Sequence, residues 1–197
     1  PTTNNFWKDG KYNPATKQID WTIYANYQEN PIHNLIIQDT PGGNQTLIEN
    51  SLKVYELEMA ENGRVEDATE KDASGVTTTE DPIEVTIGET DKAYKIVYST
   101  QVPGEVEPTY DNKAIVLDGT SELVPAIEKT VKVPDARTFV DKNSIQEETQ
   151  VNWLVEVNKG QQEVKNLKIT DTIKAAEQSY IDRSIEVHEL DYDADGN

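Results

Sequence analysis

The chain has 197 residues, 37 acidic and 18 basic, so its formal net charge is −19 and its isoelectric point is near 4.4. This charge argues against binding to nucleic acid or to an anionic membrane surface, because both would repel it. The absence of cysteine excludes disulfides, thiolate metal sites and cysteine nucleophiles. No apolar run approaches the length of a membrane span, so we expect no membrane insertion in this fragment.

Alternating polar and apolar residues indicate folded strands despite a mean hydropathy of −0.72. Short runs rich in Val, Ile, Thr and Tyr predict an antiparallel sandwich with strands at 19–26, 32–38, 51–58, 83–87, 93–101 and 111–117. Helices are predicted only at 173–178 and 43–49. The acidic segment 58–81 is interpreted as a long hairpin tip or a loop.

An internal repeat is the most informative feature. Residues 19–26 are matched by residues 151–158, and an Asp-Thr pair follows each tryptophan strand. Asp39 lies 18 residues after Trp21, as Asp171 lies 18 residues after Trp153. An offset of 132 residues is the size of a whole domain and too long for a solenoid unit. The repeat therefore predicts two tandem domains.

The predicted domain boundaries follow from this repeat. Residues 1–124 form a complete domain, and residues 125–134, which two prolines bracket, form a linker or the first strand of the next domain. Residues 135–197 are the front half of a second, homologous domain. We expect an all-β chain with tandem antiparallel β-sandwiches, of which the second is incomplete.

Six motifs occur in order along the first copy, at 8–12, 19–23, 39–45, 54–57, 94–100 and 110–114. They are Lys-x-Gly-x-Tyr, Ile-x-Trp-x-Ile, Asp-Thr-x-x-Gly-x-Gln, Val-Tyr-Glu-Leu, Tyr-x-Ile-x-Tyr-x-Thr and Tyr-x-Asn-x-Ala. The series resembles the isopeptide-forming collagen-adhesin domains of Gram-positive cell-wall surface proteins. The resemblance implies an immunoglobulin-like sandwich that is closed by a covalent bond between side chains.

In the family a lysine amine attacks an asparagine carboxamide and releases ammonia. By position, the resemblance implies that Lys8 is the nucleophile, Asn112 the acceptor and Asp39 the acid-base group. Burial among aromatic side chains would favour the neutral amine that attack requires. Lys11 is a rival nucleophile, because strand register decides which lysine points inward.

The second copy repeats the aspartate as Asp171, but its lysine is ambiguous between Lys129 and Lys142. Its asparagine is expected beyond Asn197, so a second cross-link is not expected to form in the chain as it stands.

Asp191, Asp193 and Asp195 open like a calcium loop, with carboxylates at alternate positions before a glycine. The bidentate glutamate of such a loop is missing, and an acidic hairpin turn explains the same residues. We therefore expect no metal and no cofactor.

The resemblance implies a fragment of an extracellular bacterial adhesin, anchored to the cell wall through a region outside this chain. The expected partner is a host matrix protein such as collagen, fibrinogen or fibronectin, and no enzyme activity on an external substrate is expected. The alternative is a stalk or pilus domain that spaces other domains and binds nothing, because tandem repetition also builds stalks.

Overall fold

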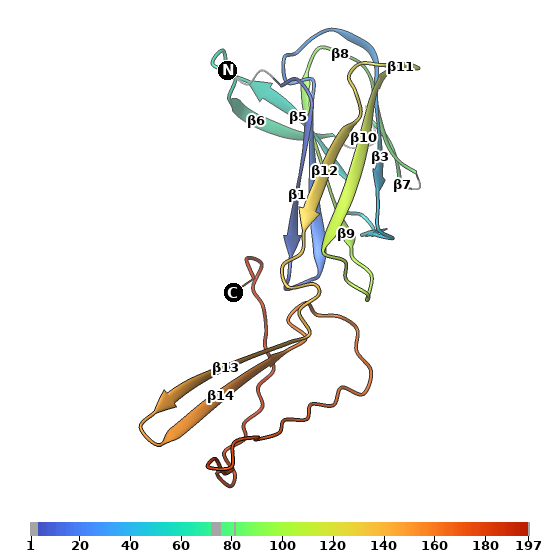
Figure 1. Ribbon diagram of the computed structural model, residues 1–197. Coiled ribbons are helices and arrows are strands. Elements are labelled where there is room, and N and C mark those ends of the chain that lie inside the picture. The colour runs from blue at the N-terminus through green and yellow to red at the C-terminus, as the bar shows by residue number, and fades with distance from the viewer. Residues whose placement is uncertain (1–3, 72–75, 81, 197) are drawn as a thin grey trace.

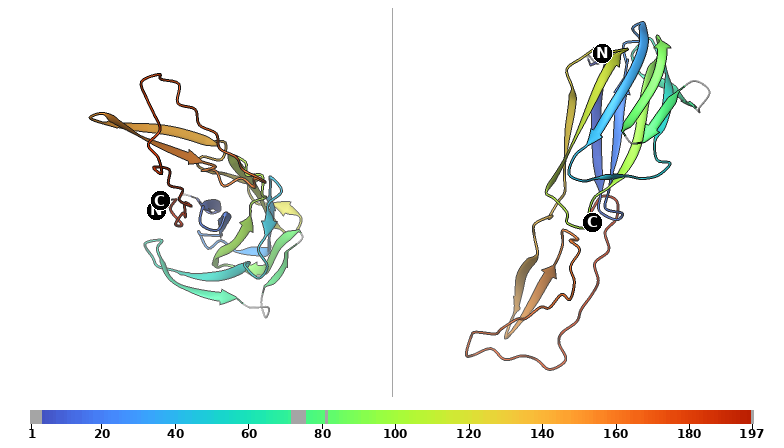
Figure 2. Two further views of the ribbon diagram at one scale, coloured as in Figure 1. Left: turned by 90° about the horizontal axis from the view of Figure 1, so that it is seen from below. Right: turned by 90° about the vertical axis from the view of Figure 1, so that its right-hand side faces the viewer.

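The computed structural model describes residues 4–71, 76–80 and 82–196, in which all regular elements are β-strands. A two-sheet sandwich occupies the upper part of Figure 1, and a long hairpin with an irregular chain lies below it. The right-hand view of Figure 2 shows an elongated molecule, with the hairpin projecting from one end of the sandwich. The prediction of an all-β fold with an antiparallel sandwich is confirmed.

The sandwich consists of two antiparallel sheets. The first runs in the order β1 (Trp7–Asn13), β2 (Gln18–Ala25), β9 (Ala93–Gln101), β5 (Lys53–Met59) and β6 (Val65–Lys71), with β4 (Thr46–Leu47) against β9. The second runs in the order β11 (Ser121–Glu122), β10 (Thr109–Asp118), β3 (Ile32–Pro41), β8 (Ile83–Thr90) and β7 (Thr77–Glu80), with β12 (Ile127–Lys132) against β10.

All six strands predicted for the first copy are present, as β2, β3, β5, β8, β9 and β10. The interpretation of 58–81 as a hairpin tip or a loop is wrong, because this segment contains β6 and β7, which pair with β5 and β8. The two strands belong to different sheets. Residues 72–75 and 81 of this segment lie outside the described residues.

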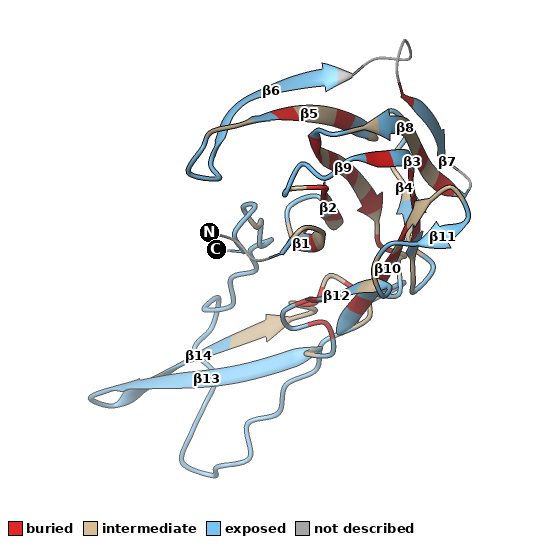
Figure 3. Ribbon diagram, turned by 90° about the horizontal axis from the view of Figure 1, so that it is seen from above, coloured by how far each residue is buried: buried red, intermediate tan, exposed pale blue. Residues whose placement is uncertain are grey.

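The core lies between the two sheets, where alternate residues of each strand point inward. Buried residues are shown in red along the facing strands in Figure 3. One cluster gathers aliphatic side chains, among them Ile23, Leu35, Ile37 and Ile96. The other cluster is rich in aromatic side chains, namely Tyr12, Trp21, Tyr98 and Tyr110, and it surrounds the candidate site.

The segment 125–134 contributes a strand to the first sandwich. Six residues of β12 pair with β10, from Thr109 opposite Lys132 to Ala114 opposite Ile127. Val131 and Val133 are buried in the aromatic cluster. The segment is therefore a paired strand of the first sandwich in this structure, and neither a free linker nor a strand of the second unit, because its apolar residues complete the first core.

The second unit contains one hairpin, β13 (Val140–Glu147) paired with β14 (Gln150–Val157), and an irregular chain from 158 to 196. Many of its large apolar residues are exposed. In Figure 3, β13 is exposed along its whole length, whereas part of β14 is intermediate. Trp153 is 49% exposed and Ile169 is 56% exposed. No second sheet covers this hairpin within the part of the chain that the structure describes.

Both predicted helices are wrong. The segment 43–49 contains a turn and β4, and Gly43 and Asn44 have φ values of 69° and 56°, which a right-handed helix does not allow. The segment 173–178 is irregular, since a helix this short has no apolar surface to pack against here. Across the described ranges, the structure contains no apolar helix long enough to cross a membrane.

Candidate functional site

Lys8, Asp39 and Asn112 meet between the two sheets, each from a different strand. Lys8 comes from β1 of the first sheet, whereas Asp39 and Asn112 come from β3 and β10 of the second. They are 6%, 3% and 1% exposed. Burying three polar side chains between apolar layers costs free energy unless they form hydrogen bonds or ion pairs with one another. The cluster is therefore a candidate site.

Strand alternation decides which lysine enters the core. Lys8 and Tyr12 are buried on the inner face of β1, and Gly10 lies between them on the same face. Lys11 points outward and forms an ion pair with Asp195 at 2.7 Å. The structure thus places Lys8, and not Lys11, beside Asp39.

Gly10 makes room for the aromatic wall of the site. It lies opposite Trp21 in the β1–β2 register, and a Cβ atom at this position would come within 2.5 Å of the indole ring. The indole therefore covers the backbone of β1 beside Lys8. The Lys8 Nζ atom lies 5.2 Å from the Trp21 ring centroid and 5.7 Å from the Tyr98 ring centroid.

Asp39 is the partner of the lysine amine. The Lys8 Nζ atom donates to both carboxylate oxygens of Asp39. The backbone N–H of Thr40 donates to Oδ1 at 3.1 Å, and the hydroxyl of Tyr98 donates to Oδ2. The carboxylate is thus surrounded by three donors that fix its position.

Asn112 lies next to Asp39 on the neighbouring strand, since β10 pairs with β3 and places Ala114 opposite Asp39. Its Nδ2 atom donates to the hydroxyl oxygen of Tyr98 at 2.6 Å. Its Oδ1 atom is buried and has no hydrogen-bond partner among the described residues. The amide is therefore held through its nitrogen, and its oxygen is unsatisfied.

Tyr98 is the site residue that the sequence reasoning missed. It is 2% exposed, and its hydroxyl lies between Asp39 and Asn112, with Lys8 Nζ at 3.4 Å. The only signal in the sequence was its place in the Tyr-x-Ile-x-Tyr-x-Thr motif, where alternation puts it on the inner face of β9. That pattern also describes an ordinary core tyrosine.

Burial determines the electrostatics of the site. Desolvation lowers the pKa of Lys8 from 10.5 to about 8, although the neighbouring Asp39 opposes this shift. Desolvation, and then the charge of Asp39, raises the pKa of Tyr98 well above its ordinary value. At neutral to mildly alkaline pH the site thus supplies neutral amine far more readily than a solvated lysine does, and the phenol keeps its proton.

The second copy contains an open counterpart of this pair. Lys142 donates to both carboxylate oxygens of Asp171 at 2.7 Å and lies 4.4 Å from the Trp153 ring centroid. Lys129, the other candidate, instead pairs with Asp9 at 2.8 Å on the surface of the first sandwich. Lys142 is opposite Val155, two residues after Trp153, as Lys8 is opposite Ile23, two residues after Trp21.

Hydrogen bonds also join the first sandwich to the second unit. We call this region, residues 102–108, 133–139 and 158–163, the joint. The 8% exposed side chain of Gln162 accepts from the N–H of Val106 at 2.7 Å and donates to the carbonyls of Val106 at 2.7 Å and Ala136 at 2.6 Å. The backbone N–H of Glu163 donates to the carbonyl of Gly104 at 2.9 Å. The joint is thus built from hydrogen bonds between segments far apart in sequence.

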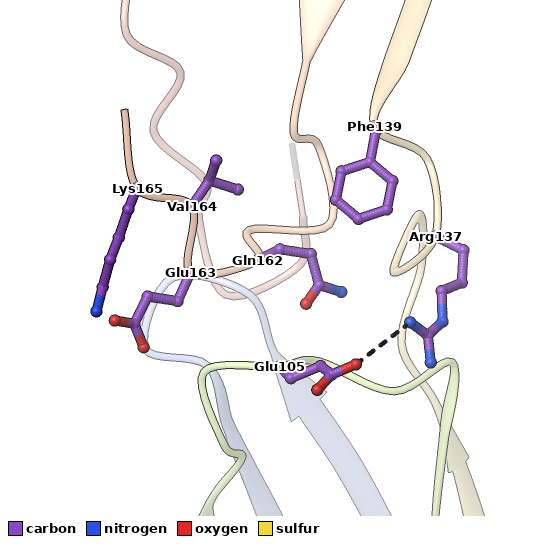
Figure 4. A pocket seen from close by; sticks show the side chains of 7 residues that line it. All are labelled: Glu105, Arg137, Phe139, Gln162, Glu163, Val164 and Lys165. Carbon is purple, nitrogen blue, oxygen red and sulfur yellow. Dashed lines mark ion pairs between the residues drawn. The ribbon is translucent and has the colours of Figure 1, made fainter. Parts of the chain in front are cut away.

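A cavity of about 450 Å³ opens beside the joint (Figure 4). Phe139 and Val164 line it together with Arg137, which pairs with Glu107 at 2.5 Å and lies 4.0 Å from Glu105. None of the residues of the Lys8 site lines this cavity. The space therefore belongs to the joint and not to the candidate site.

The acidic residues near the C-terminus form a turn. The side chain of Asp193 accepts from the N–H of Asp195 at 2.9 Å, and the carboxylate of Asp195 pairs with Lys11. Asp191 makes no part of a cluster suited to a metal, because the described residues contain no group of three or more His, Cys, Asp or Glu side chains that could hold an ion.

The fold defines the class of protein, an immunoglobulin-like domain with two antiparallel sheets. The collagen binding domain family matches residues 3–122, which is more than half of the chain, so the chain belongs to that family. The resemblance drawn from the six motifs is thereby confirmed. No curated protein sequence matches the chain.

Solved structures share the fold. The collagen-binding domain of a Staphylococcus aureus adhesin has a TM-score of 0.50 at 14% identity, covering 67% of this chain and 99% of its own. The collagen-binding subdomain of the Enterococcus faecalis surface protein ACE has a TM-score of 0.52 at 14% identity, with the same coverage. The collagen-binding domain of the Erysipelothrix rhusiopathiae surface protein RspB has a TM-score of 0.54 at 15% identity, covering 66% and 46%.

Proposed function

We propose that this chain is part of an extracellular adhesin whose first sandwich is closed by an amide bond between Lys8 and Asn112. The observation that carries the proposal is the meeting of a buried lysine, aspartate and asparagine from β1, β3 and β10. Lysine, aspartate and asparagine are common on protein surfaces. Their burial in one cluster, in a family that forms isopeptide bonds, supports a role in forming such a bond.

The geometry suits attack by the amine. Burial lowers the pKa of Lys8 to about 8, and transfer of its proton to Asp39 would give the neutral nucleophile. Tyr98 contacts both Lys8 and Asn112, so the amine and the carboxamide are held beside one another. Groups held in this way react at effective concentrations that free groups do not reach, so the fold promotes a single turnover on itself.

The bond would join two strands that lie in different sheets. It would close a loop of about 105 residues, which in the chain-entropy model stabilises the fold by several kcal/mol, as a disulfide over a long loop does. A protein without cysteine gains a covalent staple by this route, and the staple would resist both unfolding force and proteolysis.

Intact mass under denaturing conditions tests the cross-link. We expect a deficit of about 17 Da, one ammonia, in the purified chain, and no deficit in the Asn112→Ala variant. Lys142→Met is the matched control, since it removes the exposed lysine of the second copy and should keep the deficit. A wild-type mass equal to that of the sequence would exclude the cross-link.

The proposed partner is a matrix protein, with collagen first because the structural relatives named above are collagen-binding domains. An aromatic group on the outer face of the first sheet could serve contact. Trp7 stacks on Tyr24 with ring centroids 4.5 Å apart, and Tyr27 packs edge-on against both rings. All three are partly exposed, and such rings provide large contact area at little entropic cost.

A solid-phase assay on collagen, fibrinogen and fibronectin tests this part of the proposal. We expect saturable, salt-tolerant binding to collagen that Tyr24→Ala weakens. Tyr180→Ala is the control, because Tyr180 is an aromatic residue that is 52% exposed on the second unit. Binding that both variants leave unchanged would move the contact away from the first sheet.

The joint favours a second candidate function, a stalk domain that spaces other domains and binds nothing itself. Hydrogen bonds from Gln162 to Val106 and Ala136 tie the two units together, as a spacer under tension requires. A cross-linked chain that binds none of the three matrix proteins would support the stalk. Anchoring to the cell wall through a region outside this chain is common to both candidates.

A further inference from the structure

Tyr98 connects the two nitrogen atoms that the proposed reaction exchanges. Its hydroxyl accepts a hydrogen bond from Asn112 Nδ2 at 2.6 Å and donates one to Asp39 Oδ2. Asp39 in turn accepts from Lys8 Nζ. An unbroken path of hydrogen bonds thus runs from the attacking amine to the nitrogen that must leave.

Asp39 does not reach the leaving group by itself. Its hydrogen bonds go to Lys8, Thr40 and Tyr98, and the described residues show none to Asn112. Any proton that Asp39 takes from the lysine therefore needs a carrier to arrive at the amide nitrogen. Among the described residues, the Tyr98 hydroxyl is the group that hydrogen-bonds both Asp39 and the amide nitrogen of Asn112.

The lack of a donor to Asn112 Oδ1 makes proton transfer to the leaving nitrogen more important. Asn112 Oδ1 is buried and has no hydrogen-bond partner among the described residues, so no donor stands ready for a developing oxyanion. With the oxyanion left unsupported, collapse of the tetrahedral intermediate depends on a leaving nitrogen that is already protonated. An amide ion is too basic to leave, whereas ammonia leaves as a neutral molecule.

We propose that Tyr98 is a catalytic proton relay that passes a proton from Asp39 to the Nδ2 atom of Asn112. This role rests on the proposed cross-link and adds a fourth residue to it. The aromatic ring also packs in the core, but the hydroxyl is the part that reacts.

Lys8 gives a proton to Asp39, and the neutral amine attacks Cγ of Asn112, so a C–N bond forms and the carbonyl electron pair moves to Oδ1. Asp39 returns its proton to the Tyr98 oxygen while the Tyr98 proton moves to Nδ2. The lysine nitrogen then gives another proton to Asp39, the Cγ–Nδ2 bond breaks, ammonia leaves with its electron pair and the carbonyl forms again.

Tyr98 ends the reaction as it began, and Asp39 ends it protonated. Burial raises the pKa of Tyr98, which keeps the phenol protonated and able to relay at the pH of the reaction. The phenol is thus a carrier, and Asp39 is the base.

The rate of ammonia loss in Tyr98→Phe tests the relay. Chains made by cell-free translation are quenched in denaturant at intervals, and the cross-linked fraction is read by intact mass. We expect the variant to react about 100-fold more slowly than the wild-type chain. Tyr110→Phe is the matched control, because Tyr110 is also buried and its hydroxyl accepts from the N–H of Glu107 at 2.9 Å, away from Asp39 and Asn112.

A second substitution separates proton transfer from packing. Difluorotyrosine at position 98 keeps the shape and the hydrogen bonds but has a more acidic hydroxyl, so the relay predicts an altered rate. Equal rates for tyrosine and difluorotyrosine, or a wild-type rate in Tyr98→Phe, would overturn the relay and leave the cross-link standing. A wild-type chain that never loses ammonia would overturn the cross-link and the relay together.

Discussion

The two copies of the repeat share a hairpin, a tryptophan and a lysine–aspartate pair, yet only the first copy buries them. Trp21 is fully buried and Trp153 is 49% exposed. The side chain of Lys8 is 0% exposed and that of Lys142 is 36% exposed. The difference is the second sheet, which covers the first hairpin and has no counterpart over the second among the described residues.

The pairing of the lysine depends on the hairpin alone, whereas its burial depends on the second sheet. Hairpin register alone brings a lysine beside the tryptophan in both copies. In the second copy the hydrogen bond from Lys142 lowers the pKa of Asp171, as expected for a solvated ion pair. In the first copy desolvation lowers the pKa of Lys8 to about 8. Pairing is encoded by the hairpin, whereas reactivity requires the whole sandwich.

The largest expected difference between the two copies is the loss of stability when each tryptophan is replaced. Trp21→Ala removes a fully buried indole and should lower the free energy of unfolding by about 3–5 kcal/mol. Trp153→Ala removes a half-exposed ring and should cost less than about 1 kcal/mol. Denaturant unfolding in an Asn112→Ala background, which keeps all chains unlinked, measures both. Equal losses would show that the second hairpin has a core of its own.

The pH dependence of stability should reveal the buried lysine. Between pH 8 and 10 an unlinked Asn112→Ala chain binds a proton at Lys8 when unfolded but not when folded, because the pKa falls from 10.5 to about 8 on folding. Stability should therefore rise with pH across this window, by about 1–3 kcal/mol, and be lost as the pH falls through 8. Above pH 10 the raised pKa of Tyr98 acts in the opposite direction.

Urea unfolding at several pH values provides the measurement. Lys8→Met in the same Asn112→Ala background is the control, since it removes the titrating amine and should flatten the rise. A rise of the same size in both variants would assign it to other groups.

A smaller effect is expected at the joint. Gln162→Ala removes three hydrogen bonds and leaves backbone groups of Val106 and Ala136 without them. Amide hydrogen exchange at Val106 should become about tenfold faster or more, because the loop opens more easily. Gln146→Ala, on the exposed face of β13, should leave this exchange unchanged. Unchanged exchange in Gln162→Ala would mean that the loop is rigid without the joint.

The smallest effect is expected where the C-terminal turn meets the first sandwich. Lys11 and Asp195 form an ion pair whose side chains are 67% and 71% exposed. Solvent screens such a pair, so Lys11→Ala should not change thermal stability measurably. A clear fall in melting temperature would show that this turn supports the first sandwich.

The sequence predicted the elements whose signal is local. Alternation located six strands of the first sandwich, and the family resemblance drawn from the motifs implied Lys8, Asp39 and Asn112. Polar β6 and β7 were missed, because they are strands only through pairing with β5 and β8. Tertiary pairing of this kind leaves no periodic pattern.

Two features of the sites could not be read from the sequence. The role of Tyr98 depends on Asp39 and Asn112, which are 59 and 14 residues away. Lys142 was ambiguous because the turn at 148–149 is two residues shorter than the turn at 14–17, which displaces the lysine from its aligned position. In the folded hairpin, strand register still places the lysine two residues beyond the tryptophan on the opposite strand. An alignment that keeps the offset of 132 residues does not show this.

The joint also determines how the molecule transmits torque. The chain leaves the first sandwich through 133–139 and returns to it at 158–163, where Gln162 bonds Val106 and the side chain of Gln161 donates to the carbonyl of Pro14 at 2.9 Å. A single covalent strand acts as a swivel, because its backbone rotates freely. Two attachments side by side resist rotation, so a twist applied to the β13–β14 hairpin would turn the first sandwich with it.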